Sequence, residues 1–76
     1  MDMKLFIENF ASQLDETELE MLAPDTAFRE LEEWSSFLAL SIMAMVKTEY
    51  DVELSADEMR NANTIQELYD VVKSHL

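Results

Sequence analysis

The sequence predicts a single all-α domain over residues 1–76, folded as a four-helix bundle with three longer helices, one short helix and a long first loop. Apolar residues recur at the spacing of a helix face in three separate stretches. Two Ser/Thr-x-x-Glu patterns mark helix starts. Strand-like alternation is confined to residues 50–54, which are too few to make a sheet.

The first helix is expected over residues 3–14, where one face carries Met3, Phe6, Ile7, Phe10 and Leu14. The helical period is then lost between Asp15 and Trp34, a connection rich in acids that contains the turn signal Pro-Asp-Thr at residues 24–26. A connection of about twenty residues is unusual in a compact domain. We therefore expect it to be functional or to contain a turn or two of helix.

The second helix is expected over residues 36–49. Its core-facing stripe is predicted to be Ala39, Ile42, Met43, Val46 and Tyr50. The other face is also apolar, with Phe37, Leu38, Leu40 and Ala44. Because a small domain cannot easily bury a helix on all sides, we expect this second face to form an exposed apolar patch that contacts a partner.

Two capping boxes predict the remaining helices. The box at residues 55–58 opens a short helix over residues 56–61, around Met59. The box at residues 64–67 opens a final helix over residues 65–75. The core-facing stripe of this last helix is predicted to be Ile65, Leu68, Tyr69 and Val72.

The composition excludes most kinds of enzyme. Without cysteine the chain has no disulfide, thiolate nucleophile or sulfur-ligated metal. Without glycine it cannot build the common phosphate-binding or calcium-binding loops. The single histidine, His75, is the penultimate residue and is expected to fray, so a catalytic triad lacks its base. We expect neither enzymatic activity nor a metal site.

The charge indicates what kind of partner the protein binds. Its 17 acidic and 5 basic residues give a formal net charge of −12, which repels nucleic acids and anionic membranes and attracts basic protein surfaces. No segment has the pattern of a signal peptide or of a membrane span. We expect a cytoplasmic monomer that binds proteins.

Three segments together indicate a family. Residues 34–37, Trp-Ser-Ser-Phe, open the apolar helix, and residues 49–52, Glu-Tyr-Asp-Val, end it. Residues 64–65, Thr-Ile, open the last capped helix. With the Pro-Asp-Thr turn in the first loop, this order resembles the acyl carrier protein family, in its stand-alone type, over essentially the whole chain.

The resemblance places Ser36 at the serine of the family's Asp-Ser-Leu motif, with Ser35 and Phe37 at the flanking positions. It implies that a phosphopantetheinyl transferase moves 4'-phosphopantetheine from coenzyme A onto Ser36. Acyl intermediates of fatty-acid or polyketide-like biosynthesis would then be carried as thioesters on the thiol of this arm, among acyl-transferring and acyl-modifying enzymes. A serine at a helix start suits a phosphodiester, because free amides and the helix dipole favour an anion.

Two adjacent serines compete for this role. Ser36 is preferred because a hydrophobic residue follows it directly and because Tyr50 lies fourteen positions further on, as in the family's second helix. Ser35 is then expected to be the N-cap. Without the resemblance, both serines would be interpreted simply as helix caps.

The second helix departs from the family pattern. The positions that usually carry docking acids are here Leu38, Ser41, Lys47 and Thr48. Partner docking is therefore expected on Phe37, Leu40 and Ala44, with nearby Glu30, Glu32 and Glu33 supplying steering charge. This departure favours a specialised polyketide-like or modified-lipid pathway. Trp34 is a further docking candidate, although an aromatic before a helix more often packs on the core, and the three glutamates are also typical of a solvated face.

Two alternatives stay open. A peptidyl carrier is the nearest, but such carriers usually have glycines before the serine. An acidic helical interaction module that is never modified is the alternative from another class. A loop carboxylate acting as a general acid has no sequence feature that indicates a pocket around it.

Overall fold

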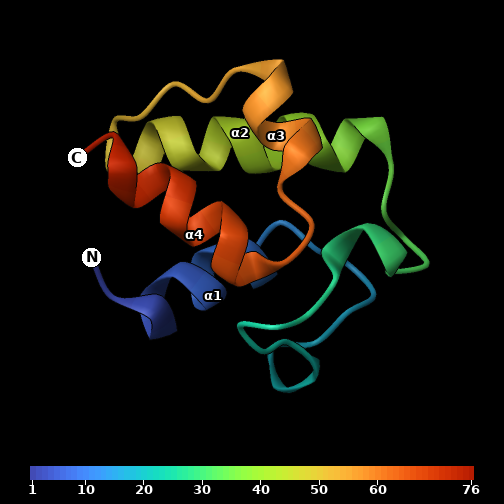
Figure 1. The fold of residues 1–76 in the computed structure, drawn as a ribbon. Helices are drawn as coiled ribbons and strands as arrows, with labels where there is room; N and C mark the ends of the chain where they lie inside the picture. The colour runs from blue at the N-terminus through green and yellow to red at the C-terminus, as the bar shows by residue number, and fades with distance from the viewer.

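The computed structural model describes residues 1–76 and contains four α-helices, two short 3₁₀ helices and no strand (Figure 1). In chain order these are α1 (Met3–Ala11), η1 (Leu19–Met21), η2 (Phe28–Glu30), α2 (Ser36–Tyr50), α3 (Ala56–Asn61) and α4 (Ile65–Ser74). The predicted all-α bundle is confirmed, and so are the helical turns expected within the first loop. None of the helices is both long and apolar enough to cross a membrane.

Helix α1 packs against both α2 and α4 through aromatic rings. The Phe6 ring lies 5.7 Å from that of Tyr50 in α2 and 5.6 Å from that of Tyr69 in α4, measured between centroids. The Asn9 side chain also donates to the Tyr50 hydroxyl at 3.1 Å. All 17 buried residues are hydrophobic and form one cluster. The helices therefore share a single core, without buried polar side chains.

The buried side of α2 differs from the predicted stripe. Its buried residues are Leu38, Ile42, Met45 and Val46, whereas Ala39, Met43 and Tyr50 are half-buried. Leu38 and Met45 are thus core residues, and Leu38 does not belong to the exposed face. The helix is apolar nearly all round, so its sequence alone does not define which side meets the core.

Helix α1 ends at Ala11, earlier than the predicted end at residue 14. In a continued helix the Gln13 amide would donate to the carbonyl of Asn9. That carbonyl instead accepts from the Ser12 hydroxyl at 2.7 Å, and the Gln13 amide donates three residues back. Such side-chain competition disfavours further helix. Leu14 is still buried.

The first loop is tied to the start of α4. The amide of Ile65 donates to the carbonyl of Thr26 at 3.2 Å. The amide of Gln66 donates to the carbonyl of Pro24 at 2.8 Å. These two amides belong to the first turn of α4 and have no partner within the helix. The predicted turn in the loop thus caps a helix that lies far along the chain.

One of the two predicted capping boxes is complete. The Glu58 amide donates to the Ser55 hydroxyl at 3.0 Å, and the Ser55 amide donates to the Glu58 carboxylate at 2.9 Å. At the second box Thr64 accepts from the Glu67 amide at 3.1 Å, but the Glu67 carboxylate accepts from the Asn63 amide at 2.7 Å. In the second box the carboxylate therefore accepts from the residue before the N-cap, and not from the N-cap itself.

The end of α4 is held, not frayed. The helix ends at Ser74, and a ring nitrogen of His75 lies 2.7 Å from a carboxylate oxygen of Glu58 in α3. The Ser55 amide, and after it His75, hold the pKa of Glu58 below its usual value. The His75 ring makes no other hydrogen bond, and the neighbouring Ser74 hydroxyl donates to the Val71 carbonyl. His75 is thus a link between two helices.

Glu33 closes the beginning of the first loop. Its carboxylate accepts from the amide of Asp15 at 2.9 Å and from that of Glu16 at 3.0 Å. It also accepts from the Thr17 hydroxyl at 2.7 Å. These donors, the Thr17 hydroxyl first, hold the pKa of Glu33 below its ordinary value, while partial desolvation opposes them. Glu33 is therefore a structural clasp and not the free steering charge that the sequence suggested.

The residue that follows α2 has a left-handed backbone conformation. Asp51 has φ 56° and ψ 37°, a conformation that glycine usually supplies and that this glycine-free chain must make otherwise. The Asp51 amide donates to the Lys47 carbonyl at 3.0 Å. Its exposed carboxylate lies 3.1 Å from the Lys47 ammonium group and raises the pKa of Lys47. The Cβ atom of Asp51 stores backbone strain here.

Replacing Asp51 with glycine should raise the free energy of unfolding by about 1 kcal/mol, because glycine takes this backbone conformation without the Cβ clash. The Asp51→Ala variant should be less stable than the wild type, since alanine keeps the clash and lacks a side chain that can hydrogen-bond locally. Urea denaturation followed by circular dichroism measures both changes. Equal midpoints for the glycine and alanine variants would contradict this account.

The Glu33 clasp makes a pH-dependent contribution to stability. Because the folded-state pKa of Glu33 lies below its ordinary 4.5, the contribution is complete above that value and is lost as the pH falls through the lower folded pKa. Glu33→Gln should therefore unfold at lower urea than the wild type at about pH 7, and the difference should shrink at about pH 3. A difference that is unchanged between these pH values would show that the carboxylate charge has no part in the clasp.

Candidate functional site

The two serines at the start of α2 have different positions. Ser35 is the N-cap, and its hydroxyl accepts from the Leu38 amide at 3.2 Å. Ser36 is the first helical residue and is exposed, and its hydroxyl makes no hydrogen bond within the protein. The amides of Ser36 and Phe37 also lack partners, as expected in a first turn. The predicted N-cap role of Ser35 is confirmed, and Ser36 is the serine with a free hydroxyl.

Trp34 anchors the chain just before these serines. Its ring stacks on that of Phe10 in α1, with centroids 6.4 Å apart and planes 8° apart. It also lies 4.9 Å from the ring of Phe28 in η2. Phe10 and Phe28 are completely buried, whereas Trp34 is half-buried. Trp34 therefore packs on the core, as is usual for an aromatic residue before a helix, and is not a free docking anchor.

Ser36 borders a groove of about 350 Å³ that involves α2 and α3. Its apolar lining consists of Ala39, Leu40, Met43, Ala56 and Met59. Two arginines complete the lining, Arg29 from η2 and Arg60 from α3. Neither arginine belongs to a recognisable motif in the sequence. The available signal was their scarcity, since the chain has only 5 basic residues.

Arg29 joins η2 to the end of α3. Its Nε donates to the Ala62 carbonyl at 3.0 Å, and its Nη2 donates to the Met59 carbonyl. The guanidinium carbon also lies 5.6 Å from the centroid of the Phe28 ring. Carbonyls at a helix end lack donors within the helix, so a cation is favourable there. Arg29 is thus held in a defined position at the edge of the groove.

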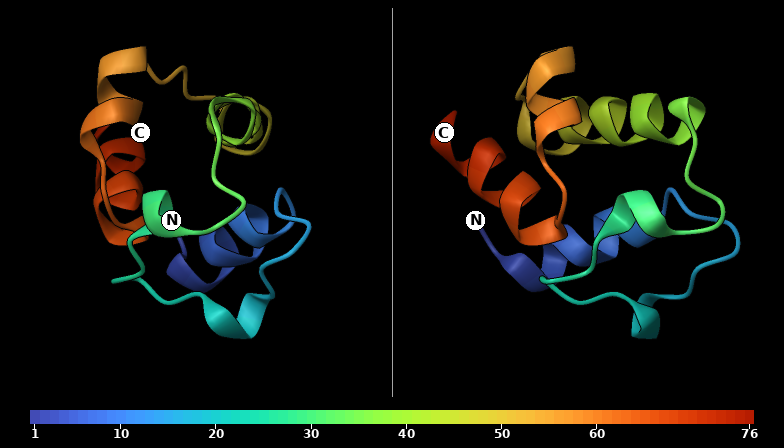
Figure 2. Two further views of the ribbon diagram at one scale, coloured as in Figure 1. Left: turned by 90° about the vertical axis from the view of Figure 1, so that its right-hand side faces the viewer. Right: turned by 45° about the vertical axis from the view of Figure 1, so that its right-hand side comes forward.

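The outer side of α2 carries an apolar patch, defined here as Phe37, Leu40 and Ala44. Phe37 is 75% exposed and Leu40 is 63% exposed, and Ala44 is also exposed. Their spacing places them on one helix face. Figure 2 (left) shows α2 end on, at a corner of the bundle, with no element over its outer side. The structure therefore brings three of the predicted docking residues together.

The predicted steering charges are only partly available. Glu30 and Glu32 are exposed near η2, whereas Glu33 is engaged by the loop. Of the positions where family members usually carry acids, Leu38 is buried and Lys47 is exposed. The outward surface of α2 is therefore apolar and carries few charges.

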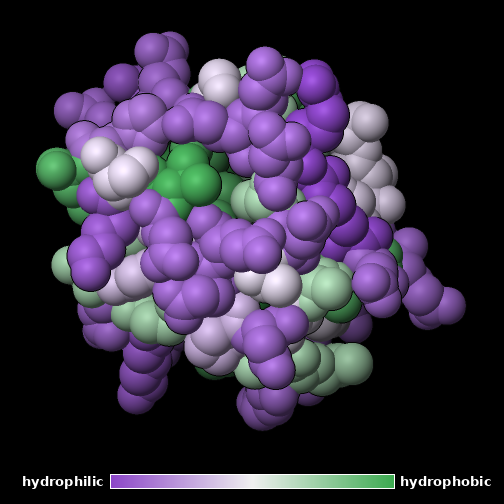
Figure 3. All heavy atoms as spheres, viewed as in Figure 1, coloured by the Kyte–Doolittle hydropathy of each residue, from purple (hydrophilic) through white to green (hydrophobic).

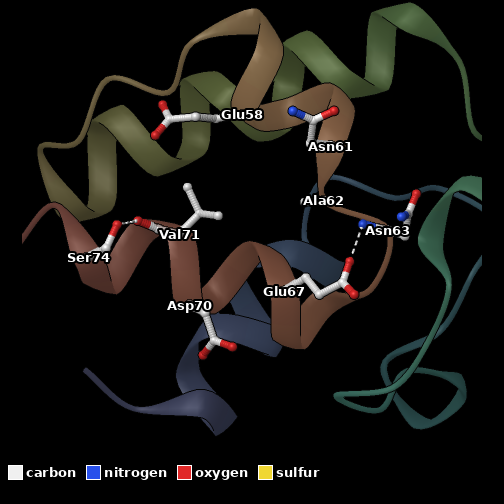
Figure 4. A pocket seen from close by; sticks show the side chains of 8 residues that line it. All are labelled: Glu58, Asn61, Ala62, Asn63, Glu67, Asp70, Val71 and Ser74. Atoms are coloured by element: carbon white, nitrogen blue, oxygen red, sulfur yellow. Dashed lines mark hydrogen bonds between the residues drawn. The ribbon is translucent and has the colours of Figure 1, made fainter.

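The largest hollow lies elsewhere, between α3 and α4, and measures about 530 Å³ (Figure 4). Figure 4 shows Glu58 projecting from α3, with Glu67 and Asp70 on α4. This face of the molecule is mostly hydrophilic, with a limited apolar area above α4 (Figure 3). The one hydroxyl group in the lining, that of Ser74, donates to the carbonyl of Val71. No group of three potential ligands could hold a metal ion together. Nothing in this hollow therefore points to chemistry.

Comparison with known proteins identifies the family. The family model described as "Phosphopantetheine attachment site" matches residues 4–72, which cover α1 through most of α4. A comparison with curated proteins found no match. Domains of this family attach 4'-phosphopantetheine covalently, carry acyl groups on it as thioesters and are not themselves enzymes. The chain belongs to the phosphopantetheine-binding carrier proteins, of which the acyl carrier proteins are an example.

Proposed function

We propose that this protein carries acyl intermediates on a phosphopantetheine arm attached to Ser36, in a specialised pathway of polyketide-like or modified-lipid type. The observation that carries the proposal is that the two serines have different structural roles. Ser35 caps the helix, and its hydroxyl is engaged by an amide. Ser36 presents an exposed hydroxyl beside two unpaired amides. A nucleophilic hydroxyl must be reachable by both coenzyme A and the transferase, and Ser36 meets that requirement.

The attachment chemistry needs little from the carrier itself. The Ser36 oxygen attacks the phosphorus that bears the pantetheine, a new P–O bond forms, and the diphosphate P–O bond of coenzyme A breaks. Adenosine bisphosphate leaves, and a base of the transferase takes the hydroxyl proton. The unpaired amides of Ser36 and Phe37, at the positive end of the α2 dipole, favour the resulting phosphodiester. The arm, when attached, supplies the thiol that this cysteine-free chain lacks.

The apolar patch supports the choice of pathway and partner. A partner enzyme that recognises it needs an apolar pocket for Phe37, with basic residues around it facing the acids of the carrier. A second copy of the chain fits less well, because two molecules of net charge −12 repel each other. We therefore assign the patch to enzyme partners and expect the carrier to be a monomer. The scarcity of acids on α2 favours partners other than those of primary fatty-acid synthesis.

Incubating the protein with coenzyme A and a broad-specificity phosphopantetheinyl transferase should raise its intact mass by one phosphopantetheine. Ser36→Ala should show no increase, because its nucleophile is gone. Ser35→Ala should still be modified, with a stability loss of about 1 kcal/mol from the missing cap. Circular dichroism confirms that each variant is folded.

A mass increase in Ser36→Ala together with none in Ser35→Ala would overturn the assignment of the serine. Absence of any increase in the wild-type protein, with several transferases, would favour the alternative of an acidic interaction module that is not modified. These two outcomes are distinct and test different parts of the proposal.

Removing the centre of the patch should slow modification. Phe37→Ser should lower kcat/KM of the transferase for the carrier by at least about tenfold, which corresponds to about 1.4 kcal/mol of lost apolar contact. The matched control is Leu5→Ser, which removes another large exposed apolar residue, 48% exposed, from α1. The wild-type rate should depend only weakly on salt. A steep loss of rate with salt, or equal effects of the two variants, would contradict apolar docking.

A further inference from the structure

The few basic residues of this protein are unevenly distributed over its hollows. Four hollows are present on the surface, and the one between α3 and α4 is lined by three acids and no basic residue. The hollow beside α1 combines Lys4 with Glu8, and the one beside the second half of α2 contains Glu49. The groove that borders Ser36 contains Arg29 and Arg60 and no acid. In a chain of net charge −12, the one hollow with a positively charged lining therefore lies next to the exposed serine.

Arg29 has the features of a preorganised anion-binding group. Its Nε and Nη2 are engaged by two carbonyls, which fix the guanidinium plane. Its Nη1 makes no hydrogen bond within the protein. Carbonyl partners orient the group but do not cancel its unit charge. Arg29 therefore places a fixed positive charge, with one hydrogen-bond donor unused, at the edge of the groove.

Arg60 offers an adaptable second contact. Its Nη1 lies 2.8 Å from a carboxylate oxygen of Asp57, and its side chain is 67% exposed. Exposed ion pairs three residues apart on a helix are weak, so this pair competes poorly with another anion. The Nε and Nη2 atoms of Arg60 have no partner in the protein. Arg60 can therefore bind a further anion while it keeps its contact with Asp57.

We propose that Arg29 and Arg60 hold the phosphodiester of the arm attached to Ser36. This proposal rests on the proposed function, because it requires the arm to be on Ser36. The phosphate is bonded directly to the Ser36 oxygen, so its anionic oxygens stand at the edge of the groove that both arginines line. Most of the remaining surface repels this anion. The two arginines are positioning residues, and they keep the first part of the arm over the groove between α2 and α3.

The test uses the intact holo protein, labelled with ¹⁵N and modified with phosphopantetheine. The Nε–Hε resonances of Arg29 and Arg60 should both move between the apo and holo forms. They should return toward their apo positions as the ionic strength rises from about 0.01 M to about 1 M, because screening weakens an exposed ion pair. This measurement needs no substitution, which matters for Arg29 because its removal would also loosen α3.

The ³¹P resonance of the holo protein provides the second readout. Arg60→Gln should move it by more than its line width, and Arg60→Lys should restore part of the wild-type position. Lys4→Gln is the matched control, since it removes the same charge from α1, outside the groove, and should leave the resonance in place. A response confined to one arginine, or equal effects of the Arg60 and Lys4 variants, would overturn the proposal.

Failure of this inference is distinguishable from failure of the proposed function. If the wild-type protein gains no phosphopantetheine by mass, the proposed function fails and there is no phosphodiester to bind. If the mass increases and the increment lies on Ser36, while both arginine resonances stay where they were in the apo form, the function holds and the role of the arginines is wrong.

Discussion

The packing of Trp34 against Phe10 and Phe28 is the interaction on which the site depends. These rings come from three separate parts of the chain, and they pack directly before the two serines that open α2. Aromatic pairs of this kind contribute roughly 0.5–1.5 kcal/mol each beyond the area that they bury. They determine where the long first loop ends and in which direction α2 begins. Ser35 consequently faces the first amides of the helix as its cap, and Ser36 comes next with its hydroxyl in solvent. The Glu33 clasp holds the same loop at its other end.

Charged residues and apolar residues have different roles around Ser36. The acids give the molecule its strong negative field, but the outer side of α2 presents the apolar patch, with Phe37 at its exposed end nearest the serine. The two arginines lie in the neighbouring groove, where a phosphodiester on Ser36 would need compensation. The patch and the groove share Leu40, so a partner bound to the patch also lies close to the arm. In this account apolar contact with the patch, more than the negative field, determines which enzymes bind.

Local patterns predicted those parts of the fold that depend on neighbouring residues. The limits of α3 and the start of α2 were correct because a serine cap and a helical period act over a few positions. The end of α1 was placed too late because the Ser12 hydroxyl competes for a backbone carbonyl, which apolar spacing does not reveal. The predicted core-facing side of α2 is wrong because the helix is apolar nearly all round, so its sequence does not distinguish a buried side from an exposed one. The roles of Glu33 and Arg29 depend on partners 16 to 33 residues away, so only the folded chain reveals them. At the site itself, Ser36 and the patch followed from local pattern and family resemblance, whereas the groove with its arginines did not.

The most direct test of this account is to locate the arm in the protein purified from its native host. Proteolysis followed by fragmentation mass spectrometry of the peptide that contains Ser35 and Ser36 distinguishes the two adjacent serines. The account predicts a phosphopantetheine increment on Ser36 and an unmodified Ser35, because Ser35 is engaged as the helix cap. An increment on Ser35, or a fully unmodified peptide from cells in which the pathway is active, would contradict the central claim that the packing before α2 presents Ser36 for modification.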